Sequence, residues 1–474
     1  MGQSGLHELD AVAQAAAVRD GDISPVELVE HHLDRIARYD ERLGAFLTVT
    51  AESARDQAAS AAQRLTEGEL DTLPPLFGVP TAIKDLTATA DARTTFGSKA
   101  FEEFTPEADA HAVRLLRAAG TISLGKTNTP EFGLSGYTDN DLAGPARSPW
   151  DPTRTAGGSS GGAAAAVAAG LVPFAHGSDG GGSIRIPAAC CGIFGLKPSR
   201  GRVSNGPAGS DVTGFTIQGP LSWTVRDAAA MLDALAVPQP GDPYWAPPLP
   251  QGETFLQYAG RDPGRLRIGV YTDPGLPELE VDPEIRDAHT AAAELLASLG
   301  HEVVEIPNPF GNSLKDSFLG IWATQSLLLK TAGEDALRPL SKWWREIGRG
   351  LSAEQFLDAM SGAQLASRRA VEAQSPYDAV LSPTLAIQPP APEWFQEGDA
   401  LQEAQRQTGL SCYTAAFNAS GQPAASLPLG RSAEGVPIGV MLAGRPAGEA
   451  QLIALCAQIE AARPWAGERP PLFG

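Results

Sequence analysis

The sequence predicts an α/β fold in which helices cover both faces of a central sheet. From residue 71 onward, short apolar runs alternate with segments of helical periodicity, the pattern of a sheet covered by helices. The chain has 474 residues, of which 43% are hydrophobic and 19% charged, so it can bury a large core. Its 51 glycines and 39 prolines follow no fixed period, which excludes a collagen-like chain.

The first 70 residues are expected to be helical. In "ISPVELVEHHLDRIARY", Ser24 stands before Pro25 and three residues before Glu27, which is a capping box at a helix start. Apolar residues then recur at helical spacing. We therefore expect residues 1–70 to form an N-terminal helical segment packed on a main domain, residues 71–474, that is one structural unit.

The main domain contains the expected strands and most of the expected helices. The strands are short β-prone runs within "GVPTAIKDL", "TISLG", "LVPFAHG", "RLRIGVYTD", "HEVVEIP" and "YDAVLSP". Near the end, "QPAASLPLGRSAEGVPIGVMLAGR" predicts two strands joined by a polar turn. Helices are expected over residues 109–118, 283–299 and 353–373.

Composition excludes several classes of partner. The 36 Lys and Arg against 56 Asp and Glu give a net charge of −20, which repels nucleic acid and anionic lipid surfaces. We expect no secretory signal and no membrane span, since neither a basic start followed by an apolar run nor a long apolar stretch occurs. The four cysteines lack metal-ligand spacing and predict reduced, buried thiols in a cytoplasmic protein with no metal and no cofactor.

One short pattern suggests a nucleotide site and fails in context. "GTISLGKT" fits the phosphate-loop spacing from Gly120 to Gly125, Lys126 and Thr127. A phosphate loop follows a strand and precedes a helix. Here a helical segment precedes Gly120, "TISL" is β-prone, and Pro130 follows where a helix should extend. The glycines are therefore expected to bracket a strand.

The densest functional signal is "GGSSGGAAAAVAAGLVPFAHGSDGGGSIRIPAA", residues 157–189. "GGSSGG" leads into an alanine-rich helix, and three successive glycines, Gly180, Gly181 and Gly182, precede Ser183. Successive glycine amides can point inward as a nest and stabilise a developing oxyanion. A serine hydroxyl beside that nest is well placed to be a nucleophile.

A nucleophilic serine needs a base, and the chain offers two. His176 lies near Ser183 in the sequence, but within the apolar run "LVPFAHG", which favours a core or supporting histidine. Lys84 ends the apolar run "FGVPTAI" before Asp85. Desolvation lowers a lysine pKa and can make the amine a neutral base near pH 7.

Together these motifs resemble the amidase signature family of serine hydrolases. The resemblance rests on "FGVPTAIKDL", "LGKTNTPEFG", "SPWDPTRTAGGSSGG", "GSDGGGSIRIPAACCGIFGLKPSRGRVS" and "NASGQPAASLPLG", and covers nearly all of the chain. It implies the amidase signature fold, with a central mixed twisted sheet. It also implies a Ser–cis-Ser–Lys triad in which Ser183 matches the nucleophile, Ser159 the bridging serine and Lys84 the base.

The resemblance implies further roles around this triad. The oxyanion would be bound by four backbone amides, those of Gly180, Gly181, Gly182 and Ser183. Ser160 would support the bridging serine by hydrogen bonding. Asp179 and Arg185 would pair and hold the glycine nest.

Other readings of the same residues remain open at this stage. "GGSSGG" also fits G-x-S-x-G, the nucleophile elbow of α/β-hydrolase esterases, with Ser159 or Ser160 at its centre. His289 and His301 would have to supply the base, and neither follows a strand end. A binding scaffold in which the glycines only form turns would have little reason to hold Lys84 and both serines. Within the family, the glutamyl-tRNA amidotransferase A subunit usually has threonine at the position of Gly180.

The expected activity is hydrolysis of a non-peptide carbon–nitrogen bond in a small-molecule amide. The resemblance favours a stand-alone bacterial-type amidase acting on acyl or aryl amides, lactam oligomers of the nylon type, or carbamates. The assembly is left open, with a homodimer as one option. The pocket walls are expected from residues 137–141 with Tyr137 and Asp139, from the "FLGIWATQ" helix with Trp322, and from "YTAAFNASG" with Phe417 and Asn418.

Overall fold

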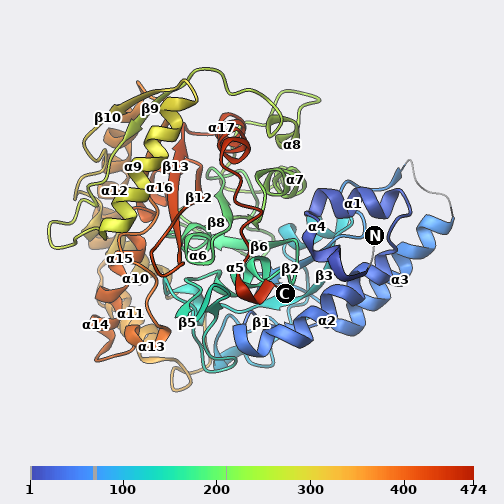
Figure 1. Cartoon of the computed structure of the whole chain (residues 1–474). Coiled ribbons are helices and arrows are strands. Elements are labelled where there is room, and N and C mark those ends of the chain that lie inside the picture. Colours follow the sequence, from blue (N-terminus) through green and yellow to red (C-terminus); the bar gives the residue numbers. More distant parts are fainter. Residues whose placement is uncertain (1–2, 68–71, 210, 474) are drawn as a thin grey trace.

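A central mixed sheet organises the molecule (Figure 1). The computed structural model describes residues 3–67, 72–209 and 211–473. Within these residues, eleven strands form one sheet in the order β1-β3-β2-β6-β8-β7-β12-β13-β11-β9-β10, and β4 and β5 form a separate pair. The pairs β3–β2, β2–β6, β11–β9 and β9–β10 are parallel and the others antiparallel. The mixed sheet of the predicted fold class is confirmed.

The strands occupy the predicted apolar runs, with additions. Their bounds are β1 (Phe46–Val49), β2 (Pro80–Lys84), β3 (Ile122–Thr127), β4 (Arg147–Ser148), β5 (Asp151–Thr155), β6 (Phe174–Asp179), β7 (Phe194–Lys197), β8 (Ile217–Ser222), β9 (Arg267–Val270), β10 (Glu302–Glu305), β11 (Ala379–Pro383), β12 (Ala424–Arg431) and β13 (Pro437–Gly444).

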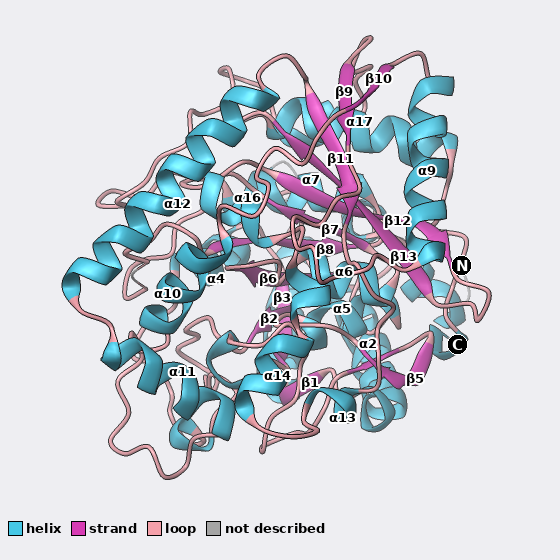
Figure 2. Cartoon of the chain, turned by 90° about the vertical axis from the view of Figure 1, so that its left-hand side faces the viewer, coloured by secondary structure: helices cyan, strands magenta, loops and turns pink. Residues whose placement is uncertain are grey.

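Helices flank the sheet on both sides, as predicted. In Figure 2, α9 lies on one side of β11 and β12, and α10 and α12 lie on the other. The bounds are α1 (Ala11–Arg19), α2 (Pro25–Leu43), α3 (Ala51–Thr66), α4 (His111–Ala118), α5 (Gly161–Ala168), α6 (Arg185–Cys191), α7 (Val225–Leu235), α8 (Phe255–Tyr258), α9 (Pro283–Ser298), α10 (Lys315–Gln325), α11 (Pro339–Gly350), α12 (Ala353–Gln374), α13 (Pro392–Phe395), α14 (Ala400–Arg406), α15 (Thr408–Ser411), α16 (Ala415–Ser420) and α17 (Glu449–Ala462).

The N-terminal segment is helical except at one place. The capping box of α2 is present, with Ser24 and Glu27 bonded reciprocally. The expectation of helices alone over residues 1–70 is wrong, because β1 pairs antiparallel with β3 at the edge of the main sheet. This pairing requires a very close backbone approach, since a Cβ on Gly125 would stand 2.1 Å from the carbonyl oxygen of Thr48. The N-terminal segment therefore contributes a strand to the sheet of the main domain.

The phosphate-loop spacing belongs to a strand, as expected. Gly120 follows α4 with a positive φ of 89°, and Ile122–Thr127 is β3. Lys126 is fully buried, with its Nζ 3.3 Å from Asp85 Oδ1. Its ammonium also donates to Thr94 Oγ1 and the Thr87 carbonyl. Lys126 thus has buried, structural contacts rather than those of a phosphate loop.

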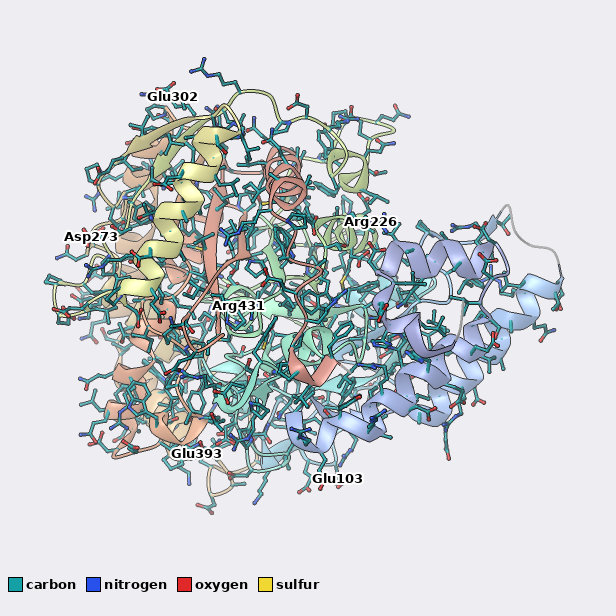
Figure 3. All side chains as sticks on the ribbon, viewed as in Figure 1. Glu103, Arg226, Asp273, Glu302, Glu393 and Arg431 are labelled. Carbon is teal, nitrogen blue, oxygen red and sulfur yellow. The ribbon has the colours of Figure 1, made fainter. Side chains whose placement is uncertain are left out.

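Many charged side chains are exposed on the surface, among them Glu103, Glu302 and Glu393, which Figure 3 labels. Several are paired there, as Arg226 is with Asp10 and Arg431 with Glu468. All four cysteines are free, and three are buried as predicted; Cys412 is only half-buried because it lies in the wall of a pocket. No helix among the described residues is long and apolar enough to cross a membrane.

Candidate active site

The ends of two neighbouring parallel strands place the key side chains together. Lys84 is the last residue of β2, and Asp179 is the last residue of β6. Because the two strands run parallel, with Ile83 opposite His176, their carboxyl ends meet at one edge. Ser159 and Ser160 stand immediately before α5, which packs against both strands.

Lys84 is buried and contacts two hydroxyls. Its Nζ lies 2.7 Å from Ser159 Oγ and 3.1 Å from Ser178 Oγ, and it donates to the Ser178 carbonyl at 3.2 Å. Burial lowers the pKa of Lys84 from 10.5 to about 7, and the negative charge of Asp179 opposes part of this shift. The amine can therefore exchange a proton with Ser159 near neutral pH.

The two serines of "GGSSGG" have different surroundings. The Gly158–Ser159 peptide is cis, as the resemblance implies. Ser160 was expected to bond to Ser159, but its hydroxyl donates to the Ser178 carbonyl at 3.2 Å and accepts from the Ser178 amide at 3.3 Å. The Ser160 amide donates to the Ser183 carbonyl at 3.1 Å. Ser160 therefore ties the end of β6 and the turn of Ser183 to the start of α5.

Ser183 faces a pocket beside free backbone amides. It lines the pocket together with Gly181, and its hydroxyl has no hydrogen-bond partner among the described residues. The amides of Gly180, Gly181 and Ser183 likewise donate to no acceptor within the described part of the chain. The amide of Gly182 instead donates to Asp179 Oδ1 at 2.7 Å. Of the four amides expected to bind an oxyanion, that of Gly182 is therefore already occupied.

An ionic network lies behind the glycine turn. The expected pair is confirmed: Arg185 contacts Asp179 through both Nε and Nη2 at 2.9 Å, and both residues are fully buried. Burial alone would raise the pKa of Asp179, but the charge and hydrogen bonds of Arg185, with Lys197 and Asn418, hold it well below its usual range. Asp179 is therefore ionised near neutral pH.

His176 does not take part in this arrangement. It is fully buried, its Nε2 lies 2.7 Å from Gln218 Oε1, and burial lowers its pKa to about 4. These contacts support the expectation of a core histidine over that of a base. Among the described residues, no group of three His, Cys, Asp or Glu side chains could hold a metal ion.

The pocket in front of Ser183 has a volume of about 660 Å³ and mostly apolar walls. Of the residues expected to line it, Trp322 does so. Its ring stacks on Phe318 with centroids 5.5 Å apart, and a Cβ on Gly181 would meet Phe318 at 3.0 Å. The aromatic pair of α10 therefore covers the glycine turn.

The other expected wall residues lie elsewhere. Tyr137 and Asp139 border a separate cavity of about 470 Å³, where Tyr137 donates to Glu403 and Asp139 pairs with Arg338. Phe417 and Asn418 are completely buried and belong to the wall of neither cavity. Asn418 contacts Asp179 and Arg185 instead.

Three residues with a place in the site were not anticipated: Ser178, Phe318 and Thr414. Ser178 lies inside the glycine-serine signature, next to Asp179, so its place in the sequence could have identified it. Phe318 lies in the helix that was expected for Trp322. Thr414, whose hydroxyl donates to the Gly181 carbonyl at 2.7 Å, lies within the run noted for Phe417.

The whole chain is similar to several known proteins. The family model described as "Amidase" matches residues 27–453. A protein named "Putative amidase" from Synechocystis sp. is 38% identical over 95% of this chain and 88% of its own length. The "6-aminohexanoate-cyclic-dimer hydrolase" of Paenarthrobacter ureafaciens is 36% identical, with 98% and 97% covered. A solved structure of 6-aminohexanoate cyclic dimer hydrolase complexed with substrate superposes with a TM-score of 0.91, at 33% identity, over 99% of this chain and 100% of the other.

Proposed function

Since the chain belongs to the amidase signature family and is an amidase that hydrolyses carbon–nitrogen bonds, we propose that it acts through an acyl-enzyme on Ser183, with Ser159 and Lys84 as the proton relay. One observation carries the proposal. A fully buried lysine with its pKa lowered to about 7 contacts Ser159, and the turn bearing Ser183 presents a free hydroxyl and free amides to an apolar pocket. Membership of this family also argues against the alternative of an α/β-hydrolase esterase.

Acylation needs a base that is neutral before the reaction. Ser183 Oγ attacks the amide carbonyl carbon, while its proton passes to Ser159 and the Ser159 proton passes to Lys84. The carbonyl oxygen becomes an oxyanion, which the amides of Gly180, Gly181 and Ser183 stabilise. When the carbon–nitrogen bond breaks, Lys84 returns its proton through Ser159 to the leaving nitrogen, and the acyl group remains on Ser183.

Deacylation repeats the same relay with water. Water attacks the ester carbon, its proton passes towards Lys84, and the proton is returned to Ser183 Oγ when the carboxylic acid leaves. The lysine is neutral at the start and end of each half-reaction. A pKa near 7 suits both directions, because the group must accept a proton and also release it.

The pocket favours a neutral, apolar substrate. Its walls near Ser183 include Ile186, Phe318 and Trp322. The charged residues in its wall have partners already, since Glu278 pairs with Lys315, and Arg406 donates to backbone carbonyls and stacks on Trp394. A charged group placed beside Ser183 would lose hydration without gaining a partner.

We therefore propose that the substrate is an acyl or aryl amide, a lactam oligomer or a carbamate without ionised groups near the scissile bond. The cyclic-dimer hydrolase that this chain resembles is named for one such substrate. The alternative, an amidotransferase A-type subunit, would have to bind glutamine, whose ammonium and carboxylate would compete with the existing Glu278–Lys315 pair and the contacts of Arg406. The expected substrates are small molecules in either case.

Labelling with a fluorophosphonate tests the proposal. The phosphonyl group should be found by peptide mass mapping on Ser183, and the label should disappear in Ser183→Ala. Ser160→Ala, which keeps the relay, should still be labelled on Ser183. A label on Ser159 or Ser160 with Ser183 unmodified would overturn the assignment. Turnover of a neutral anilide, an aliphatic amide, a carbamate and a cyclic amide dimer, against glutamine, would test the substrate class.

A further inference from the structure

We propose that Thr414, the residue preceding α16, is a positioning residue for the oxyanion site. Its hydroxyl and the carboxylate of Asp179 hold the two ends of one peptide group, that between Gly181 and Gly182. This peptide separates the amides of Gly181 and Ser183, and holding it sets the directions of both. The inference rests on the proposed role of Ser183 as the nucleophile.

Thr414 holds the carbonyl end of the peptide. The side chain is fully buried, and its Oγ1 lies 2.7 Å from the Gly181 carbonyl oxygen and 3.2 Å from that of Ser411. A hydroxyl has one hydrogen to donate, and the shorter contact marks Gly181 as its main acceptor. The side chain also packs against the turn itself, since a Cβ on Gly182 would stand 2.2 Å from Thr414 Oγ1.

Asp179 holds the N–H end of the same peptide. The Gly182 amide donates to Asp179 Oδ1 at 2.7 Å. The carboxylate is itself fixed from α16, because Asn418 Nδ2 lies 2.9 Å from Asp179 Oδ1 and 2.8 Å from the Asp179 carbonyl oxygen. One short helix, distant in sequence, therefore supports both ends of the peptide.

A run of glycines needs such support. Glycine backbones reach conformations closed to other residues, and Gly182 uses one of them with φ of 132°. The same freedom would let the Gly181–Gly182 peptide rotate, which would reorient the neighbouring amides. An oxyanion site acts by being organised before charge develops, so loss of the Thr414 bond should weaken transition-state binding more than substrate binding.

The test compares Thr414→Val, which has nearly the same shape and no hydroxyl, with Thr414→Ser, which keeps the hydroxyl. On a neutral anilide, Thr414→Val should lower kcat by about 10- to 100-fold with little change in KM. Thr414→Ser should stay within about threefold of the wild type. A trifluoromethyl ketone with a phenylethyl chain adds to Ser183 and leaves a charged oxygen. Its inhibition constant should rise in Thr414→Val by about the factor lost from kcat/KM.

Thr121→Val is the matched control. Thr121 is also buried, and its hydroxyl donates to a backbone carbonyl, that of Leu116, at 2.9 Å, but it lies outside the pocket wall. It should lose comparable thermal stability and keep wild-type kcat and ketone affinity. If Thr414→Val does not fold, Thr414→Ala, which needs less space, gives the same comparison.

The proposal is overturned if a folded Thr414→Val or Thr414→Ala binds the ketone as tightly as the wild type. It is also overturned if kcat falls only in proportion to lost folded protein, as in Thr121→Val. These results differ from failure of the proposed function, in which the wild type itself would not be labelled on Ser183. A wild type labelled there, beside a Thr414→Val variant that reacts at the same rate, would remove only the inference about Thr414.

Discussion

Lowering the pH below 7 should protonate Lys84 and stop amide hydrolysis. With a pKa of about 7, roughly one tenth of the lysine is neutral at pH 6 and about nine tenths at pH 8. The value of kcat/KM should therefore rise about tenfold from pH 6 to pH 8 and then level off. A lysine with its ordinary pKa of 10.5 would instead give about a hundredfold rise over the same interval, with no plateau before pH 10.

Two charged or titratable neighbours, Asp179 and His176, do not titrate in this interval. Asp179 stays ionised because Arg185 holds its pKa low, and His176 stays neutral because burial lowers its pKa to about 4. The assay uses an anilide without ionisable groups, followed from pH 5.5 to 10. Ser178→Ala is an internal check, because its hydroxyl lies 3.1 Å from Lys84 Nζ and favours the charged amine. Removing it should move the inflection to lower pH.

The same pKa has a consequence for stability. Because the folded pKa of Lys84 is below the unfolded one, the unfolded chain binds more protons between pH 7 and 10.5. The destabilisation is complete below pH 7 and is lost as the pH rises to 10.5, with a total of about 4–5 kcal/mol. Lys84→Met should therefore melt at a higher temperature than the wild type at pH 7, and the difference should shrink towards pH 10.

Two results would refute this reasoning about Lys84. One is a rate that keeps rising through pH 9, which would mean that burial does not lower its pKa. The other is a Lys84→Met enzyme that retains the inflection and turnover of the wild type.

Four further substitutions have distinct outcomes. Gly182→Ala should abolish activity or folding, because its Cβ would stand 2.2 Å from the buried hydroxyl of Thr414. Gly180→Ala, whose nearest contact is at 3.2 Å, should fold and lose less activity. Melting temperatures and kcat/KM check both variants. Lys126→Met should lose about 3–5 kcal/mol of stability, because it leaves buried Asp85 without its ion-pair partner. ATP should not raise the melting temperature of the wild type, and a nucleotide-dependent rise would contradict a purely structural role of Lys126. His176→Gln should keep kcat/KM within about tenfold, and a loss equal to that of Lys84→Met would point to a histidine base.

The sequence predicted the elements whose signal is local. Alternating apolar runs and helix caps located β2, β3, β6 and the helices α2, α9 and α12. It did not predict β1, because four residues between two helices carry little pattern, and their pairing with β3 is a long-range event. The resemblance assigned Ser159 and Ser183 through the glycine-serine signature, and Lys84 through "FGVPTAIKDL". The pocket walls had no such signal, because nothing local tells which of the 16 Phe and 8 Trp residues face a cavity.

Asn418 shows why a site residue can be misplaced from sequence. An asparagine near the end of the chain could face a substrate or satisfy a buried charge, and composition cannot separate the two. In the structure Asn418 is buried and supplies hydrogen bonds that the Asp179–Arg185 pair needs, so it does not face the pocket. Arg185 donates to Asp179 through Nε and Nη2, and Nη2 also donates to Asn418 Oδ1 at 2.7 Å. Asn418 Nδ2 in turn donates to Asp179 Oδ1.

A buried ion pair is tolerated only when its remaining donors and acceptors are also satisfied. Arg185 and Asp179 are six residues apart, so the pair itself was predictable, but the amide that completes it comes from 233 residues further along the chain than Arg185. The buried Asp179–Arg185 pair by itself implies that a further polar side chain must bond to it. Which residue supplies that side chain depends on how α16 packs behind the glycine turn. Asn418→Leu, which removes the hydrogen bonds to Asp179, Arg185 and the Phe215 carbonyl and keeps the size of the side chain, should therefore lower stability by several kcal/mol before it changes substrate choice. An altered substrate preference in a variant as stable as the wild type would return Asn418 to the pocket.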